Sequence, residues 1–129
     1  MPGAIEEILR YECPVQWTSR VAGEDIAMRG KTIKRGDIVL SSLGAANRDP
    51  EVFERPDEFD IRRKENRHLS FGAGPHFCLG ATLARMEASI AIASLLARYP
   101  KLRLAISPRK LAWQKGLTFR GLRTLPLKI

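Results

Sequence analysis

The decapeptide at residues 71–80, FGAGPHFCLG, contains the side chain best suited to chemistry, which is Cys78. Gly72, Gly74 and Gly80 accompany this cysteine, and we expect backbone geometry to require glycine there, because glycine permits tight turns and close approach of a flat ligand. A helical pattern follows at once, so free N–H groups and a positive dipole end would face the sulfur and favour the thiolate. A single thiolate is one way in which proteins hold haem iron, and it is the one that drives O–O cleavage.

Several stretches of the chain together resemble one known family. The loop at 71–80 and the following ATLARMEA at 81–88 are similar to the haem-binding loop and cysteine-proximal helix of the cytochrome P450 family, in its bacterial soluble form. Upstream, EILR at 7–10 resembles the family's glutamate–arginine helix motif, and 47–60 resembles the segment before the haem loop. The order and spacing fit over nearly the whole chain. The cysteine loop is specific, whereas Glu-x-x-Arg alone is common as a surface ion pair.

The resemblance implies a haem-thiolate monooxygenase, an oxidoreductase that inserts one atom of O2 into a small organic substrate. The implied cofactor is haem b (iron protoporphyrin IX), with Cys78 as the axial ligand of the iron. Enzymes of this family are much longer than 129 residues, so the chain corresponds to their C-terminal part. The groups that deliver protons to oxygen then lie outside it, and we expect no catalytic residue within it.

Two other functions remain open at this stage. One is a truncated, non-catalytic remnant that binds haem weakly or not at all. The other is a small basic module that holds zinc through the four residues Cys13, His68, His76 and Cys78, because mixed cysteine and histidine sites exist. The paired short spacings of a zinc finger are absent from the sequence. Outside the zinc hypothesis, we expect Cys13 to be structural.

The resemblance also implies further cofactor contacts. It places His76 and Arg20 at the haem propionates, for which the guanidinium of arginine is well suited as a bidentate donor. Phe71 would pack beside the thiolate and exclude water from it, which tunes the potential of the iron. We expect His68 either near a propionate or on the surface.

A structural ion pair is expected on the first helix, where Glu7 and Arg10 lie three residues apart on one face. In the family, such a pair forms a buried network with a third, basic residue that precedes a Phe-Asp pair. Here that position holds Glu58, and a carboxylate cannot replace a guanidinium. We therefore expect Arg62 or Arg63 to substitute, since an uncompensated buried charge would be costly.

Two short segments are implied to face the substrate. The first contains Val15 and Gln16, and the second contains Leu117 and Thr118. Without the resemblance, the apolar residues among them would be interpreted as ordinary core.

The expected fold class is mainly α with small antiparallel β-sheets, the C-terminal haem-binding part of a cytochrome P450-like fold. Pro14 ends the first helix, Pro100 ends the long one, and glycines separate short alternating runs. We expect one partial domain over 1–129, with a helix at 2–12, short strands at 17–43, an irregular segment at 47–70, the haem-thiolate loop at 71–80, the cysteine-proximal helix at 79–98 and hairpins at 101–129.

The helix at 79–98 is apolar nearly all round, a pattern typical of a helix that is buried on most sides. A chain of this size has few elements with which to cover it. We therefore expect the isolated chain to be marginally stable or prone to aggregation.

The net charge of +8 does not indicate a nucleic-acid-binding protein, because the basic residues are spread along the chain. The local cluster at 62–64, with Arg67, is either a solvated loop or a basic proximal face on which an acidic ferredoxin or flavoprotein electron donor docks. We expect no membrane span and no secretory leader. Two cysteines make no disulfide framework, which favours a cytoplasmic location.

Overall fold

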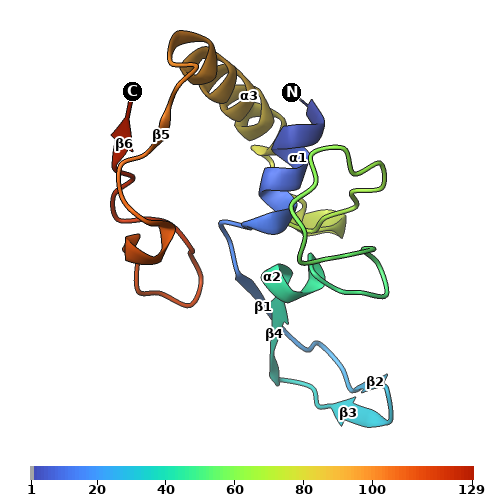
Figure 1. Cartoon of the computed structure of the whole chain (residues 1–129). Helices are drawn as coiled ribbons and strands as arrows, with labels where there is room; N and C mark the ends of the chain where they lie inside the picture. The colour runs from blue at the N-terminus through green and yellow to red at the C-terminus, as the bar shows by residue number, and fades with distance from the viewer. Residues whose placement is uncertain (1) are drawn as a thin grey trace.

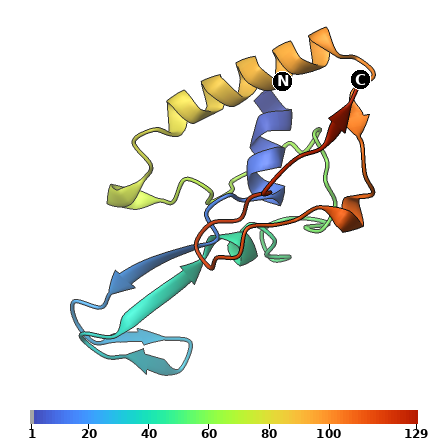
Figure 2. The ribbon, with the colours of Figure 1, turned by 90° about the vertical axis from the view of Figure 1, so that its left-hand side faces the viewer.

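The structure is a computed structural model and describes residues 2–129. It consists of helices and three two-stranded antiparallel sheets, as the sequence predicted. In Figure 2 the long helix α3 (Ala81–Arg98) runs across the top and α1 (Pro2–Tyr11) lies beneath it. The irregular segment at 47–70 (green) lies on one side of α1 in Figure 1, and the C-terminal segment (orange to red) lies on the other.

Helix α1 is the centre of the buried core. Its apolar and polar residues separate onto two faces, and Ile5 is buried against the rest of the chain. Glu7 and Arg10 of the same helix are also buried, on a different side of the helix from Ile5. The core is completed by Phe53 from the irregular segment and Leu43 from the strand side. A core that contains an ion pair depends on complete hydrogen bonding around it, since an unpaired buried charge is costly.

The residues at 17–42 form two strand pairs that extend away from α1 (Figure 1). Strand β1 (Trp17–Val21) pairs antiparallel with β4 (Ile38–Ser42), with Trp17 opposite Ser42 and Val21 opposite Ile38. Strands β2 (Ile26–Met28) and β3 (Lys31–Ile33) form the hairpin at the far end. Both residues of its two-residue turn have positive φ, 48° at Arg29 and 75° at Gly30, as in turns that match the twist of paired strands.

A short helix, α2 (Leu43–Ala46), follows β4 directly and was not expected from the sequence. Ser42 caps it, because its Oγ accepts a hydrogen bond from the backbone N–H of Ala45 at 3.2 Å. Leu43 is buried and anchors the turn to the core. The helix therefore delivers Asn47, the next residue, into the buried region beside α1.

Helix α3 begins two residues later than expected, because residues 79 and 80 belong to the preceding turn. Within the described chain only Ala81 of this helix is buried, so the burial on most sides expected from its composition is not present. Its exposed large apolar residues are Leu83, Met86, Ile90, Leu95 and Leu96, and the adjacent Leu79 is exposed as well. In Figure 2, α3 runs along the upper edge of the molecule, with α1 beneath it and no other element of the chain above it.

The C-terminal segment returns past α1 and pairs its two ends. Strand β5 (Arg103–Leu104) pairs antiparallel with β6 (Leu127–Lys128), and Trp113 forms an isolated bridge with Leu122. No helix among residues 2–129 combines the length and apolar character needed to cross a bilayer.

Candidate functional site

The loop at 71–80 folds back on itself before α3 begins. The backbone N–H of Cys78 donates to the carbonyl oxygen of Phe71 at 2.9 Å, which closes the loop. Gly72 and Gly74 have φ of 74° and 68°, so backbone geometry favours glycine at both positions. Gly80 has an ordinary φ of −83°, and a Cβ added there would lie 3.9 Å from the Cys78 Sγ. The backbone conformation therefore does not by itself require glycine at position 80.

An open cavity of about 350 Å³ lies over this loop, and we call it the Cys78 cavity. It brings together most of the residues that the sequence assigned to a cofactor. The loop, β1 and the segment before β1 all contribute to its lining, which consists of Val15, Thr18, Arg20, Ser41, Leu43, Leu69, Phe71, Gly72, Ala73, His76 and Cys78. Cys78 is exposed, so its sulfur is accessible to a ligand in the cavity.

Arg20 supplies a cation to this cavity from β1. Its Nη1 donates to the Thr18 Oγ1 at 3.1 Å and to the Ser19 carbonyl oxygen at 2.7 Å. Both acceptors are neutral, and within residues 2–129 no carboxylate lies within salt-bridge distance of this guanidinium. The cavity thus combines one thiol with a cation that lacks an anionic partner, a donor set that fits an iron-bearing ligand with carboxylate groups.

Behind the cavity, Glu7 and Arg10 form a fully buried bidentate pair. The Arg10 Nε and Nη2 donate to the two Glu7 carboxylate oxygens, each at 2.8 Å, and both side chains are 0 % exposed. The remaining N–H groups of Arg10 point to three backbone carbonyl oxygens of the irregular segment, those of Asn47, Pro56 and Glu58. The structural role expected for this pair thus has a geometric basis, since it joins α1 to the irregular segment.

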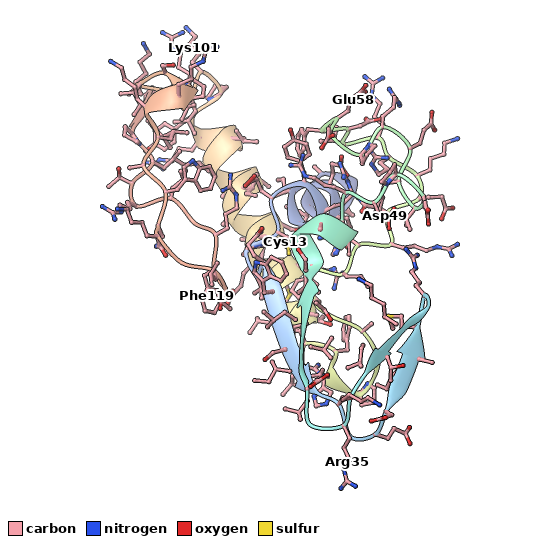
Figure 3. All side chains as sticks on the ribbon, turned by 90° about the horizontal axis from the view of Figure 1, so that it is seen from below. Cys13, Arg35, Asp49, Glu58, Lys101 and Phe119 are labelled. Atoms are coloured by element: carbon pink, nitrogen blue, oxygen red, sulfur yellow. The ribbon has the colours of Figure 1, made fainter. Side chains whose placement is uncertain are left out.

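Arg63 is the third basic residue of this network. Its Nε lies 3.3 Å from the Glu7 Oε2, and its side chain is only 10 % exposed. Glu58 contributes its backbone carbonyl, while its carboxylate points outward to Arg55 at 2.8 Å; Figure 3 shows Glu58 at the periphery. Of the two substitutes that the sequence suggested, Arg63 is therefore the one used.

The Glu7 carboxylate is held in its ionised form by this network. Burial by itself would raise its pKa, but hydrogen bonds from Arg10 and from the Asp60 amide outweigh that effect, as do the charges of Arg10 and Arg63. The pKa of Glu7 therefore lies below its ordinary value. Above its ordinary pKa, Glu7 is therefore a charged and fully paired group within the core.

Comparison with known proteins decides the family. A sequence profile described as Cytochrome P450 matches residues 1–110 of the chain. The chain belongs to the cytochrome P450 family. It is 49 % identical over 127 residues to the polyketide biosynthesis cytochrome P450 PksS of Bacillus subtilis, covering 98 % of this chain and 31 % of PksS. It is 43 % identical over 129 residues to the 6-deoxyerythronolide B hydroxylase of Saccharopolyspora erythraea, covering 100 % of this chain and 32 % of the hydroxylase.

Solved cytochrome P450 structures match the fold as well. The structure of PksS aligns with a TM-score of 0.93 at 49 % identity, over 98 % of this chain and 33 % of that one. The structure of CYP109E1 from Bacillus megaterium in complex with testosterone aligns with a TM-score of 0.93 at 45 % identity, over 99 % of this chain and 35 % of that one. The chain thus spans about a third of the length of the cytochrome P450 proteins it matches.

Asn47 is a buried residue of this cytochrome P450 chain to which sequence reasoning gave no role. Its side-chain Oδ1 accepts from the Leu69 N–H at 2.7 Å, and its Nδ2 donates to the Ser70 Oγ at 2.8 Å. The Ser70 hydroxyl in turn donates to the Leu9 carbonyl oxygen at 2.7 Å. Because the Asn47 carbonyl also accepts from Arg10, one residue links the buried ion pair to the start of the loop that carries Cys78. The only sequence signal was an amide directly after a short apolar run.

His68 lies outside the Cys78 cavity and is not on the surface either. Its side chain is 2 % exposed, and its Nε2 lies 3.1 Å from the Glu6 carboxylate. Its Nδ1 accepts the backbone N–H of Ser70 at 3.2 Å, so the ring is a donor to Glu6 through Nε2. Burial lowers the pKa of His68 despite the opposing effect of Glu6. Both sequence expectations for this residue, propionate contact and surface exposure, thus differ from its observed place.

The two segments expected to face a substrate pair with each other. The backbone N–H of Gln16 donates to the Thr118 carbonyl oxygen at 2.7 Å, and Val15 forms a bridge with Phe119. Val15 lines the Cys78 cavity, but Gln16 lines a separate one beside Cys13, and Leu117 is largely exposed to solvent. Of the four predicted residues, only Val15 lies in the same cavity as the thiol.

The four residues of the zinc hypothesis are not gathered in one place. Cys13 is buried near the centre of the molecule in Figure 3, with its Sγ donating to the Val15 carbonyl oxygen at 2.9 Å, and burial raises the pKa of this thiol. His68 faces Glu6, away from the Cys78 cavity. Among the described residues, 2–129, no group of three or more histidine, cysteine or acidic side chains is arranged to hold a metal ion. The zinc hypothesis was therefore wrong.

Proposed function

We propose that this chain supplies the axial thiolate and one wall of the haem pocket of a cytochrome P450 monooxygenase. The observation that carries the proposal is the Cys78 cavity, in which an exposed thiol and the unpaired cation of Arg20 lie together with His76, Phe71 and Gly72. In this proposal Cys78 binds the iron of haem b, and Arg20 and His76 bind its propionates. Gly72 and Gly74 keep the loop free of side chains that would obstruct a flat cofactor.

The residues of the chain hold and protect the ligand. Cys78 is held in the loop by the hydrogen bond from its backbone N–H to the Phe71 carbonyl oxygen. The ring of Phe71 lines the same cavity and limits the access of water to the sulfur. When bound, thiolate-ligated haem supplies the oxygen chemistry by which one atom of O2 enters an organic substrate. Val15, Leu43 and Leu69 give the cavity an apolar lining, which suits the porphyrin of haem, and we propose an apolar organic substrate beside it. The complex of CYP109E1 with testosterone is consistent with such a substrate class.

An electron donor of acidic character is the partner we propose. Arg63 is committed to Glu7, so the accessible basic residues of the predicted docking cluster are Arg62, Lys64 and Arg67. Acidic Glu65 lies 3.4 Å from Arg67 and weakens the positive field there. We therefore propose Arg62 and Lys64 as the main contacts of a ferredoxin or flavoprotein, with an encounter rate that falls as ionic strength rises.

The test of the haem proposal is a reduced carbon monoxide difference spectrum of the chain reconstituted with haem. We expect the strongly red-shifted Soret band of a thiolate-ligated haem in the wild-type chain. Cys78→Ser should abolish the band. Cys13→Ser is the matched control and should keep it, because Cys13 is buried outside the Cys78 cavity.

A second experiment applies if the isolated chain does not bind haem by itself. The 129 residues are placed into full-length PksS, in exchange for the stretch they match. A thiolate spectrum that survives Cys78→Ser in this chimera would overturn the assignment of the ligand. A wild-type chimera without any thiolate spectrum would favour the non-catalytic remnant. The structural argument for such a remnant is weaker than the sequence suggested, since Arg63 completes the network that Glu58 had put in question.

A further inference from the structure

Glu6 joins α1 to α3 and to the start of the thiolate loop. Its carboxylate accepts two hydrogen bonds from Arg85 of α3, from Nε at 2.7 Å and from Nη2 at 2.9 Å. It also accepts a hydrogen bond from the Nε2–H of His68 at 3.1 Å. These bonds hold the carboxylate ionised, and the hydrogen bond from Arg85 is the main cause of a lowered Glu6 pKa. Glu6 is adjacent to Glu7 but points to a different set of partners, so the buried network does not account for it.

Arg85 connects this carboxylate to the residue that holds Cys78. Its guanidinium lies 4.6 Å from the centroid of the Phe71 ring, within cation–π range. Phe71 accepts the Cys78 N–H through its carbonyl oxygen and lines the same cavity as the thiol. A cation and a carboxylate therefore lie one aromatic ring away from the proposed iron ligand, and their charges compensate each other.

We propose that Glu6 and Arg85 are positioning residues for the Cys78 loop and that their charge balance sets the electrostatic field at its thiolate. The proposal rests on the haem-thiolate function for its electrostatic part only. The geometric part concerns the loop itself, in which Arg85 holds the Phe71 ring and Glu6 holds both Arg85 and His68. His68 fixes the same stretch by accepting the N–H of Ser70.

The geometric part is tested without haem, by amide hydrogen exchange of Cys78 in the 129-residue chain. Glu6→Gln and Arg85→Gln should each speed exchange of this N–H about three- to tenfold, because each removes one ion pair or cation–π support. The control variants are Glu12→Gln and Arg120→Gln. That pair has a similar exposure and an arginine 3.9 Å from the Trp113 centroid, although its guanidinium meets the carboxylate through Nε alone. Its aromatic partner, Trp113, does not line the Cys78 cavity, whereas Phe71 does. The controls should leave the Cys78 amide unchanged.

The electrostatic part is tested by the ferric/ferrous midpoint potential of the haem-loaded chain or of its PksS chimera. Glu6→Gln leaves the Arg85 cation uncompensated and should shift the potential upward, because nearby positive charge favours the added electron. Arg85→Gln leaves the Glu6 carboxylate uncompensated and should shift the potential downward. The double variant should return toward the wild-type potential. A purely structural role would move both single variants in the same direction, so opposite signs are the decisive readout.

Arg85→Lys separates charge from geometry. Lysine keeps the cation but lacks the planar fork, so this variant should keep a potential near the wild-type value while its Cys78 amide exchanges faster. The side chains of Arg85 and Glu6 are 35 % and 29 % exposed, so solvent and salt partly screen their charges. The potentials are therefore measured at low ionic strength.

Unchanged exchange in Glu6→Gln and Arg85→Gln would overturn the positioning role. Shifts of equal sign in the two potentials would overturn the electrostatic role. A wild-type chimera that fails to bind haem would instead contradict the proposed function, and the exchange measurement would still decide whether Glu6 and Arg85 position the loop.

Discussion

Every N–H group of the Arg10 guanidinium is used inside the protein. Two go to Glu7 and three go to backbone carbonyls, so a residue on α1 holds three points of the irregular segment at once. Such an arrangement explains how a segment with no helix or strand can keep one conformation, since its carbonyls are fixed by a charged donor rather than by a ladder. Asn47 extends the same principle to the Cys78 loop.

Replacement of Arg63 should reveal its place in this network. We expect Arg63→Ala to cost about 1–3 kcal/mol of the free energy of unfolding, because Glu7 loses a charged donor in a buried setting. Arg62→Ala, one residue away and exposed, should cost less than about 0.5 kcal/mol. Urea unfolding followed by circular dichroism measures both. Equal costs would contradict the assignment of Arg63 as the third basic residue.

At the scale of residues, the sequence predicted the residues that would bind a cofactor better than the residues that position them. Cys78, Arg20 and His76 could be placed because the spacing of the loop and a family resemblance pointed to them, and they do share a cavity. Glu6 could not, because it stands next to Glu7, and nothing in the sequence says which of two adjacent acids meets which arginine. The answer depends on how α1 crosses α3, which is a tertiary property.

At the scale of elements, the positions of proline and glycine determined how much could be predicted. Pro14 and Pro100 mark the ends of α1 and α3 closely, because proline cannot continue a helix. The short helix α2 gave no periodic signal, since a single turn is stabilised by its Ser42 cap and by burial of Leu43 rather than by its own pattern. The pairing of β5 with β6 joins residues far apart in sequence, so no local pattern could predict it.

The thiolate loop offers a test of its backbone. Gly74→Ala should cost about 1–2 kcal/mol of stability, because a Cβ at a φ of 68° is strained even though no atom lies within 4 Å of it. Gly80→Ala is the matched control in the same loop, with an ordinary φ of −83°, and should be close to neutral. Urea midpoints of the two variants compare them directly. A Gly80 variant as damaging as the Gly74 variant would show that something other than backbone strain governs the loop.

At the scale of the whole molecule, a family fold is present over about a third of its usual length. Large apolar side chains on α3 and on the β1–β4 pair are exposed, among them Leu83, Ile90, Ile38 and Leu40. Apolar surface of this extent on a small chain favours association. The composition of α3 predicted that other elements would bury it, and the structure shows which of its apolar side chains are exposed.

We expect the purified 129-residue chain to self-associate at micromolar concentration. Leu83→Lys together with Ile90→Lys should reduce this association, because both side chains lie exposed on α3 and contribute nothing to the buried core. Sedimentation velocity over a range of concentrations measures the effect. A wild-type chain that remains a monomer and melts cooperatively would contradict this expectation.

Acid should destabilise the chain in two steps. The pKa of buried His68 lies below its ordinary value of 6.5, so the unfolded chain takes up that proton first, and stability begins to fall as the pH drops below about 6.5. The pKa values of Glu6 and Glu7 lie below their ordinary value of 4.5, so their contribution is present above that pH and is lost as the pH falls further. Urea midpoints between pH 8 and pH 3 (a range chosen to bracket about two units around these values) measure the profile. Greater stability at pH 5 than at pH 8 would contradict it.

The unequal accessibility of the two thiols has a practical consequence. Cys13 is enclosed in the core, whereas Cys78 is exposed. A maleimide dye added to the folded chain should therefore attach at one position only, with a stoichiometry of one equivalent and without any prior cysteine substitution. Because that position is the proposed iron ligand, protection from the dye on titration with haem would count occupied molecules directly, even in a sample too heterogeneous for a clean absorption spectrum.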